Sequence, residues 1–415
     1  MRALDGPAPF VGSNALAISP DGRNVYVASS RSDAIAIFAR NSRTGKLAQR
    51  KGRAGCVARR GTDSCAPARA LNGPNSVAVS ADGRNVYVTS RVSDAVTAFR
   101  RNRSTGALTQ LRGAGGCVAD RLAKGCATGR ALGGADVVAV SPDGENVYVG
   151  AFTADAVAIL DRNPSTGALT QPADATGCVV ATPLAGCATG LALDAPEGLA
   201  VSGDGANVYV ASASSSAVLS FARDASSGAL TQAADGSGCI VQSPLAGCTT
   251  GTQIGGANAV AVSGGDVYVT TLLSKSLASF TRDEGTGLLT QKSGTSACAI
   301  YVLAVGCSLV REFRAPEGVA VSPDGASVYA TAFASGAIAV FNRNTTSGGV
   351  MQKRTARGCM SSRPRRPGCI RGRGLRGVSS IAVSPDGRFV YSAAFKSDAV
   401  AVFKRAAAPR TPRKG

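Results

Sequence analysis

The chain has 415 residues, with 12 cysteines, no histidine, no tryptophan and a formal net charge of +19. The lack of histidine excludes Ser-His-Asp and Cys-His catalysis and every histidine-ligated metal site. No run of eighteen apolar residues occurs, which excludes a membrane-spanning helix of ordinary length.

The charge is unevenly distributed along the chain. Residues 1–130 carry 21 Lys and Arg against 7 Asp and Glu, and residues 351–415 carry 16 against 2. Residues 131–260 instead carry 2 against 11. If the chain closes into a ring, its two basic ends become neighbours and form one basic sector opposite an acidic one.

The first thirteen residues are predicted to form a linker. They contain no apolar stretch of the kind found in a signal peptide. Residues 2–7 instead resemble residues 69–74, which precede the second unit of a repeat described next. We therefore expect the sequence to begin partway through a linker, with a missing strand, a seventh cysteine pair and an export signal encoded upstream.

A β-hairpin pattern organises the rest of the chain. In residues 19–27, Asp21-Gly22 leads from one apolar run into a second, which is the signature of a tight hairpin. The tyrosine of the second run occurs seven times at spacings of 59 to 62 residues: Tyr26, Tyr87, Tyr148, Tyr209, Tyr268, Tyr329 and Tyr391.

Each unit of about 61 residues is predicted to contain four short strands, in the second unit residues 76–80, 85–89, 95–99 and 107–110. Such a unit cannot bury its own apolar face, so neighbouring units must stack. We predict an all-β fold, a seven-bladed β-propeller of four-stranded antiparallel blades over residues 14–405. The last blade lacks its outer strand, and residues 406–415 are predicted to be a disordered basic tail.

The twelve cysteines occur in six pairs between the fourth strand of one unit and the first strand of the next. Disulfides are the favoured interpretation, because zinc needs four N/S ligands and each blade offers only two thiols. Six disulfides would indicate an oxidising compartment, and hence an extracellular or cell-surface location. The pairs are Cys56/Cys65, Cys117/Cys126, Cys178/Cys187, Cys239/Cys248, Cys298/Cys307 and Cys359/Cys369.

An arginine recurs at the end of every third strand, and seven copies favour a structural role. We expect it to contact the hairpin-turn aspartate, Asp21 and its equivalents, or carbonyl groups of a neighbouring blade. The seven copies are Arg40, Arg101, Arg162, Arg223, Arg282, Arg343 and Arg405.

The residue before each first strand should ring the mouth of the central tunnel. All seven are polar: Asn14, Asn75, Asp136, Glu197, Asn258, Glu317 and Ser379. Three interpretations remain open. The ring simply hydrates the tunnel mouth; Asp136, Glu197, Asn258 and Glu317 bind a hard cation such as Ca²⁺; or one of the carboxylates Asp136, Glu197 and Glu317 is a general base.

The most basic loop lies in and after the last cysteine pair. Its arginines are candidates for binding polyanions in a salt-sensitive way, although a merely solvated surface is the alternative. Nucleic acid is disfavoured because no aromatic residues are interleaved with the cations. These arginines are Arg363, Arg365, Arg366, Arg371, Arg373 and Arg376.

The repeat resembles the lactonase-type seven-bladed propellers, most clearly over residues 138–171, with Val-Ala-Val-Ser-Pro-Asp-Gly, Val-Tyr-Val and Thr-Gly-Ala-Leu-Thr-Gln. That superfamily includes 6-phosphogluconolactonase, carboxymuconate cyclase and surface-layer repeats with a Tyr-Val-Thr-Asn signature. The resemblance implies this fold across nearly the whole chain. Its enzymatic members often carry a histidine before the first strand, where this chain has Asn, Asp, Glu or Ser.

Two functions are compatible with this sequence. The favoured one is an extracellular or cell-surface binding module, monomeric, whose loop-rich face, with the cysteine loops on it, binds an anionic glycan, a cell-wall polymer or a protein. The alternative is a lactone hydrolase, similar to 6-phosphogluconolactonase or to the calcium-binding gluconolactonase-type propellers, with its site at the tunnel mouth. Glu197 and Glu317, both in Ala-Pro-Glu-Gly, are then the best candidates.

Overall fold

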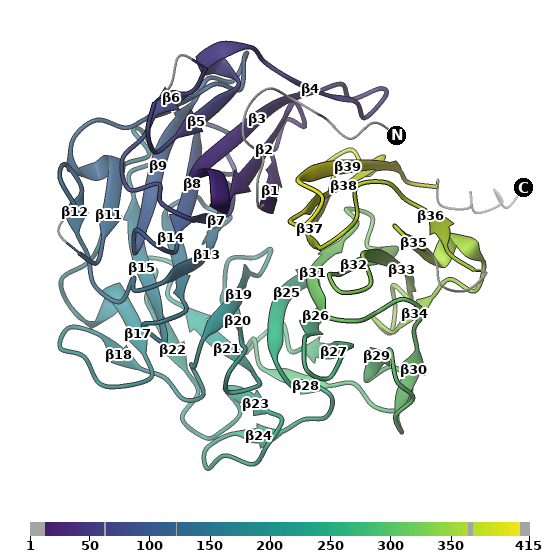
Figure 1. Cartoon of the computed structure of the whole chain (residues 1–415). Coiled ribbons are helices and arrows are strands. Elements are labelled where there is room, and N and C mark those ends of the chain that lie inside the picture. The colour runs from purple at the N-terminus through teal and green to yellow at the C-terminus, as the bar shows by residue number, and fades with distance from the viewer. Residues whose placement is uncertain (1–12, 62–63, 122, 364–367, 407–415) are drawn as a thin grey trace, which may run out of the picture.

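The computed structural model describes residues 13–61, 64–121, 123–363 and 368–406. Within these residues the chain forms seven β-sheets that follow one another around a ring (Figure 1). The predicted seven-bladed propeller is therefore confirmed. Most of the predicted linker, residues 1–12, and most of the predicted tail, residues 407–415, lie outside the described residues.

Each blade begins with an inner strand, and the inner strands of adjacent blades contact one another around the ring. These strands combine buried and partly buried residues; in the inner strand of blade two, Pro74 and Val77 are buried and the other four residues are partly buried. The inner strands are β1 (Ser13–Ile18), β7 (Pro74–Val79), β13 (Ala135–Val140), β19 (Pro196–Val201), β25 (Ala257–Ser263), β31 (Pro316–Val321) and β37 (Val378–Val383).

The second strand of each blade is buried along its whole length. The Val-Tyr-Val run supplies this strand with side chains for both faces, because each face packs against a neighbouring blade. The second strands are β2 (Asn24–Ser29), β8 (Asn85–Ser90), β14 (Asn146–Ala151), β20 (Asn207–Ser212), β26 (Asp266–Thr271), β32 (Ser327–Ala332) and β38 (Phe389–Ala394).

The third strand pairs antiparallel with the second in every blade. It is rich in apolar and β-branched residues, for example in Ala34-Ile35-Ala36-Ile37-Phe38, and such residues suit a buried strand. The third strands are β3 (Ala34–Arg40), β9 (Ala95–Arg101), β15 (Ala156–Arg162), β21 (Ala217–Arg223), β27 (Ser276–Arg282), β33 (Ala337–Arg343) and β39 (Ala399–Lys404).

The fourth strand is interrupted in blades one to six, which sequence analysis does not anticipate. Its first piece pairs with the end of the third strand, and its second piece pairs with the beginning of that strand. In blade one, the helical turn η2 (Gly52–Ala54) separates the two pieces. The first pieces are β4 (Leu47–Gln49), β10 (Leu108–Gln110), β16 (Leu169–Thr170), β22 (Leu230–Gln232), β28 (Leu289–Gln291) and β34 (Val350–Gln352).

In blades one to six, the second piece of the fourth strand is followed by a short parallel strand. The second pieces are β5 (Cys56–Ala58), β11 (Cys117–Ala119), β17 (Cys178–Val180), β23 (Cys239–Val241), β29 (Cys298–Ile300) and β35 (Cys359–Ser361). The parallel strands are β6 (Ala66–Pro67), β12 (Ala127–Thr128), β18 (Ala188–Thr189), β24 (Thr249–Thr250), β30 (Cys307–Leu309) and β36 (Ile370–Arg371).

All six predicted disulfides are present, and no cysteine is free among the described residues. The bonds join Cys56 to Cys65, Cys117 to Cys126, Cys178 to Cys187, Cys239 to Cys248, Cys298 to Cys307 and Cys359 to Cys369. The disulfide interpretation is therefore confirmed over zinc ligation. Six disulfides indicate an oxidising environment.

The predicted position of the cysteines, in a linker between the fourth strand and the next inner strand, needs a correction. The first cysteine of each pair begins the second piece of the fourth strand and so belongs to the blade. The second cysteine lies at the short parallel strand that sequence analysis does not anticipate. Cys307 begins β30, and in the other blades Cys65, Cys126, Cys187, Cys248 and Cys369 directly precede this strand.

The reason for this correction is that each disulfide loop returns to the sheet that it leaves. The second piece of the fourth strand and the parallel strand pair with each other, for example Val57 with Ala66. The bond thus fastens two strands of one blade together. The disulfide loops lie at the outer edge of the blades, beyond the third strand as seen from the tunnel (Figure 1).

Blade seven contains only β37, β38 and β39 in the described residues, which confirms that it lacks its outer strand. The remaining helices are single turns: η1 (Ser30–Ser32), η3 (Ala114–Gly116), η4 (Ala175–Gly177) and η5 (Ala356–Gly358). No helix in the described part of the chain is long and apolar enough to cross a membrane.

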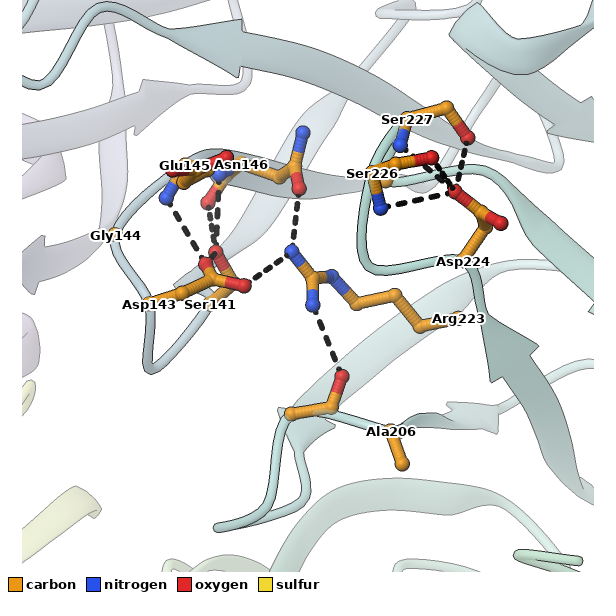
Figure 2. A network of polar contacts seen from close by, with 12 residues as sticks. Ser141, Asp143, Gly144, Glu145, Asn146, Ala206, Arg223, Asp224, Ser226 and Ser227 are labelled. Atoms are coloured by element: carbon orange, nitrogen blue, oxygen red, sulfur yellow. Dashed lines mark hydrogen bonds and ion pairs between the residues drawn. The ribbon is translucent and has the colours of Figure 1, made fainter.

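The repeated arginine joins each blade to the blade before it, as Arg223 shows (Figure 2). Arg223 of blade four lies 2.7 Å from the Asp143 carboxylate of blade three, and it donates to Asn146 Oδ1 at 2.6 Å and to the Tyr148 hydroxyl at 2.7 Å. It also donates to the Gly205 carbonyl of its own hairpin at 3.1 Å. The side chain is 1% exposed, so this contact, which we call the arginine clasp, is shielded from water.

The predicted turn aspartate is the partner in six of the seven clasps. In blade five the hairpin is shorter, and Asp266 takes the place of the turn aspartate as the partner of Arg343. Blade one binds blade seven in the same way, so the ring is closed by ordinary inter-blade contacts. The other pairs are Arg40–Asp386, Arg101–Asp21, Arg162–Asp82, Arg223–Asp143, Arg282–Asp204 and Arg405–Asp324.

Candidate functional site

A β-bulge interrupts the inner strand of every blade at or beside the residue predicted to ring the tunnel. In blade three, Ala135 pairs with Ala151 and Val137 pairs with Gly150, so that Asp136 has no opposing residue. The inner strands of the other blades contain an equivalent irregularity. A bulge redirects the side chain of its extra residue, which explains how a strand residue comes to face the tunnel mouth.

Six of the seven predicted ring residues line one cavity of about 430 Å³ at this mouth: Asn75, Asp136, Glu197, Asn258, Glu317 and Ser379. Asn14 lies in β1 at the equivalent position. The cavity is also lined by three residues that sequence analysis does not single out, Arg91, Phe333 and Phe395. The structure therefore brings the predicted polar ring together and adds a cation and two aromatic rings to it.

Asp136 is the most buried carboxylate of the ring. It is 6% exposed, and it accepts a hydrogen bond from Asn75 Nδ2 at 2.7 Å. Arg91 Nη1 lies 3.6 Å from the Asp136 carboxylate, and the Arg91 guanidinium stacks 3.8 Å from the centre of the Phe152 ring. Because the Arg91 side chain is 41% exposed, it remains accessible from the cavity.

Glu197 and Glu317 occupy alternate blades of the ring, with Asn258 between them. Asn258 Nδ2 donates a hydrogen bond to Glu197 Oε2. The glycine after each glutamate permits close packing of neighbouring inner strands, since a Cβ on Gly198 would lie 2.5 Å from the Asn258 carbonyl oxygen. Among the described residues, no hydrogen bond is made to the Glu317 carboxyl, and the charges of Glu197 and Lys396 act on its pKa.

All three carboxyl groups have raised pKa values. Burial raises the pKa of Asp136 to about 7, with Glu197 adding to this shift and Arg91 opposing it. Burial and the Glu197 charge raise the pKa of Glu317 to about 8, against the opposing effect of Lys396. Burial also raises the pKa of Glu197, although Arg91 and the Asn258 hydrogen bond oppose it. Near neutral pH the mouth therefore contains both ionised and protonated carboxyl groups.

An aromatic wall borders the carboxyl groups on the side of blades six and seven. The Phe333 and Phe395 rings lie 6.4 Å apart, Lys396 Nζ lies 4.7 Å from the Phe333 ring centre, and the Arg31 guanidinium lies 4.3 Å from the Phe395 ring centre. The cavity thus offers an apolar surface beside its polar groups, as small-molecule sites commonly do.

Comparison with known proteins gives the family context of this site. The family model described as "Lactonase, 7-bladed beta-propeller" matches residues 123–246. The lactonase-type resemblance is confirmed. No curated protein matches the chain.

Solved structures support the same lactonase-like fold. A putative 6-phosphogluconolactonase from Bacteroides uniformis has 20% identity and a TM-score of 0.57, covering 95% of this chain and 91% of its own. A periplasmic gluconolactonase from Pseudomonas aeruginosa has 20% identity and a TM-score of 0.56, covering 81% and 83%. Hydrazine synthase from Kuenenia stuttgartiensis, with 15% identity, 98% and 99% coverage and a TM-score of 0.54, shows how widely this architecture is used.

The side chains at the mouth of this lactonase-like propeller do not form a calcium site as they are placed. Ca²⁺ takes six to eight oxygen ligands. The described residues contain no group of three or more His, Cys, Asp or Glu that could hold a metal ion. In addition, Asn75 Nδ2 donates a hydrogen bond to the Asp136 carboxylate, and Asn258 Nδ2 donates one to the Glu197 carboxylate, so an oxygen of each carboxylate already has a partner. Calcium binding by Asp136, Glu197, Asn258 and Glu317 stays a prediction from residue chemistry, and no catalytic step is assigned to it.

The predicted arginine cluster is separate from the tunnel mouth. Arg363, Arg371, Arg373 and Arg376 are exposed, and none of them lines the mouth cavity. Arg365 and Arg366 lie outside the described residues. The structure thus separates the predicted ligand-binding residues into a largely half-buried ring at the tunnel mouth and exposed arginines elsewhere.

The disulfides are also separate from the tunnel mouth. None of the twelve cysteines lines the mouth cavity or any other described cavity of the chain. All of them are joined in disulfides, so none is a thiol nucleophile or a metal ligand in this structure. The cysteines, from Cys56 and Cys65 to Cys359 and Cys369, therefore have a structural place at the blade edges and no place in the candidate site.

Proposed function

We propose that the tunnel mouth hydrolyses a lactone or a related cyclic ester. The observation that carries this proposal is the placement of three carboxyl groups with raised pKa values around one cavity. A pair of carboxyl groups with pKa values of about 7 and 8 supplies an acceptor and a donor of protons near neutral pH.

Asp136 is the proposed general base. The Asn75 hydrogen bond and the Arg91 charge favour its carboxylate form, which accepts a proton from water as the water attacks the lactone carbonyl carbon. Arg91 faces the negative charge that develops on the carbonyl oxygen. Glu317, protonated below about pH 8, then donates its proton to the ring oxygen as the C–O bond breaks.

Replacing Asp136 with asparagine tests the assignment, because it removes the base and keeps the size of the side chain. We expect kcat/KM for lactone hydrolysis to fall by about 10²- to 10⁴-fold, the usual contribution of a general base. Asp161→Asn is the matched control: burial also raises the pKa of Asp161, but this residue does not line the mouth cavity. The Asp161→Asn variant should hydrolyse the lactone at the same rate as the unchanged protein.

The substrates are a panel of five- and six-membered lactones with and without hydroxyl and anionic substituents. Hydrolysis of each lactone is measured as the release of protons at constant pH. Hydrolysis that Asp136→Asn leaves at its original rate would refute the assigned base. A chain that hydrolyses no lactone of the panel would refute the proposed reaction as a whole.

A second candidate function is the binding of an anionic glycan or wall polymer by an extracellular or cell-surface protein. The observation that favours it is the exposure of Arg363, Arg371, Arg373 and Arg376 on a chain with six disulfides. The test is retention of the protein on an immobilised sulfated polysaccharide. Binding is supported if salt reverses the retention and if replacing Arg371, Arg373 and Arg376 with serine abolishes it. Asp136→Asn should leave that retention unchanged, so the two functions are separable.

A further inference from the structure

Exposed apolar side chains gather on one side of the ring. Of the twelve large apolar residues that are exposed in the described part of the chain, nine belong to blades three, four and five, which are adjacent (Figure 1). Six of the nine belong to blade five, so the exposed apolar surface is concentrated there. The nine are Leu184 and Leu191 of blade three, Leu245 of blade four, and Leu272, Leu273, Val302, Leu303, Val305 and Leu309 of blade five.

Strand pairing places these residues at the mouth end of the blades, which we define as the end where each inner strand begins. In blade five, Ala257 pairs with Thr271, and Thr271 pairs with Ser276. Ser276 in turn pairs with Ile300, which completes a row across the sheet beside the ring residue Asn258. The exposed apolar residues after β26 and β29 directly follow this row. The corresponding rows of blades three and four precede the exposed leucines of their disulfide loops.

Disulfides hold the most exposed of these side chains in closed loops. In the disulfide loop of blade five, Leu303 is 76% exposed and Val305 is fully exposed. Tyr301 N donates a hydrogen bond to the Lys275 carbonyl at 3.1 Å, and this bond joins the loop to the turn after β26. Loops that are already fixed lose little conformational entropy when another surface covers them.

The exposed apolar residues project from the molecule. None of the nine lines the mouth cavity or any other described cavity. The anchors of a protein interface usually fill well-packed pockets, and no described cavity offers such a pocket here. Separate projecting side chains suit the interfacial region of a lipid bilayer, which is fluid and adapts to each of them.

The equivalent loops of the other blades carry basic side chains. The disulfide loops of blades one, two and six pair with the start of the third strand just as those of blades three to five do. They therefore lie at the same end of the molecule as the apolar loops. Their exposed cations are Arg59, Arg60, Arg121, Lys124 and Arg363.

Carboxylates are sparse around the apolar loops. Residues 294–310 of blade five contain no charged residue. In blades three and four, the exposed carboxylates of Asp143, Asp204 and Asp224 lie on turns at the opposite, hairpin-turn end. Asp155 and Asp194 lie at the mouth end beside the start of β19, nearer the tunnel than the disulfide loops. The outer part of the mouth end thus combines apolar and basic loops, which complement a bilayer with anionic headgroups.

We propose that the mouth end of this propeller binds the surface of a lipid bilayer that contains anionic lipid. The apolar loops of blades three to five enter the interfacial region, and the basic loops of blades one, two and six contact lipid phosphate groups. The tunnel mouth then faces the bilayer. This binding surface is separate from the mouth cavity and does not depend on the proposed hydrolysis.

An introduced tryptophan tests the insertion of one loop, because the chain has no tryptophan of its own. Leu303→Trp places the probe on the apolar loop of blade five. Met351→Trp is the matched control, since Met351 is 56% exposed and pairs with Asn342 at the hairpin-turn end of blade six. Vesicles of phosphatidylcholine and phosphatidylglycerol in equal parts should shift the Leu303→Trp emission to shorter wavelength, and lipids brominated on their acyl chains should quench it. The Met351→Trp emission should not change.

Co-sedimentation with the same vesicles measures the strength of binding. Leu303→Asp should lower the partition coefficient by about tenfold or more, because it replaces an inserted apolar side chain with a charge, whereas Met351→Asp should not. Lys124→Glu should weaken binding by about threefold or more at low salt and by less at high salt. Arg103→Glu, which reverses an exposed charge at the hairpin-turn end of blade two, should have no such effect.

Three results would overturn the proposal. An absence of binding to these vesicles would exclude a bilayer as the partner. Binding that Leu303→Asp leaves unchanged would reduce it to the adsorption of a basic protein on an anionic surface. A dimer that forms without lipid and that Leu303→Asp dissociates would assign the apolar loops to a second copy. Asp136→Asn should bind vesicles as tightly as the unchanged protein, whatever the lactone assay shows.

Discussion

Replacing Arg162 with methionine is expected to lower the free energy of unfolding by about 2–4 kcal/mol, because it removes the donor to a buried tyrosine hydroxyl, a buried asparagine oxygen and a partly exposed carboxylate. Arg162 is 2% exposed and lies 2.7 Å from the Asp82 carboxylate. It also donates to the Tyr87 hydroxyl at 2.8 Å and to Asn85 Oδ1 at 2.8 Å. Methionine keeps most of the apolar stem but leaves these three groups without their donor.

The matched control is Arg405→Met, at the same position of the last blade. Arg405 binds Asp324 and the Gly387 carbonyl but has no tyrosine bond, and Asp324 is 42% exposed. Replacing Arg405 should cost only about 1 kcal/mol, because it deprives no tyrosine hydroxyl of a donor and leaves a carboxylate that is partly hydrated. Equilibrium urea unfolding measures both values. A loss below about 1 kcal/mol for Arg162→Met would contradict the role assigned to the clasp.

Replacing Glu317 with glutamine is expected to stabilise the fold at pH 9 by an amount on the order of 2–4 kcal/mol and to change little at pH 4. The pKa of Glu317 rises from 4.5 to about 8 on folding, so the folded state binds this proton more tightly than the unfolded state does. The resulting stability is fully present below pH 4.5 and is lost as the pH rises through about 8. Glutamine is neutral throughout this range and avoids the loss.

Thermal unfolding of the two proteins between pH 4 and pH 9 measures this effect. Glu284→Gln serves as the control, because Glu284 is exposed on a turn of blade five. A stability difference for Glu317→Gln that does not grow with pH would show that the carboxyl group is hydrated and ionises in the ordinary way.

The number of blades was predictable because one tyrosine recurs once in every blade. Tyr26 and its six equivalents mark the buried second strand, and a tyrosine with a fixed hydrogen-bond partner cannot shift register without losing that bond. The partnership of Arg101 with Asp21 was predictable for a similar reason, since both recur once per unit. A charged side chain that recurs in every blade needs an equally regular partner.

The interrupted fourth strand was not predictable from local patterns. Each of its pieces has only two or three residues, too few to show an alternation of apolar and polar side chains. Cys56 therefore resembled part of a linker, although it pairs with Ala36 in the sheet. The pairing of Cys56 with Cys65 was predictable from their spacing, but their place in the blade depends on contacts with the third strand.

The tunnel mouth was predictable in part. Asp136, Glu197 and Glu317 were identified from their place before the inner strand, but the bulges that turn them inward depend on strand pairing. Arg91, Phe333 and Phe395 were missed. They share the position directly after the second strand, where other blades have residues such as Ser30 and Ala213. Comparing that position across the seven units would have revealed them.

The pH dependence of kcat/KM for the best lactone tests the central claim most directly. The account predicts a bell-shaped profile that rises through about pH 7, as Asp136 ionises, and falls through about pH 8, as Glu317 loses its proton. Glu317→Gln should remove the upper limb. A profile that is flat between pH 6 and 9, or one that Glu317→Gln leaves unchanged, would contradict a pair of tunnel-mouth carboxyl groups as the catalytic acid and base.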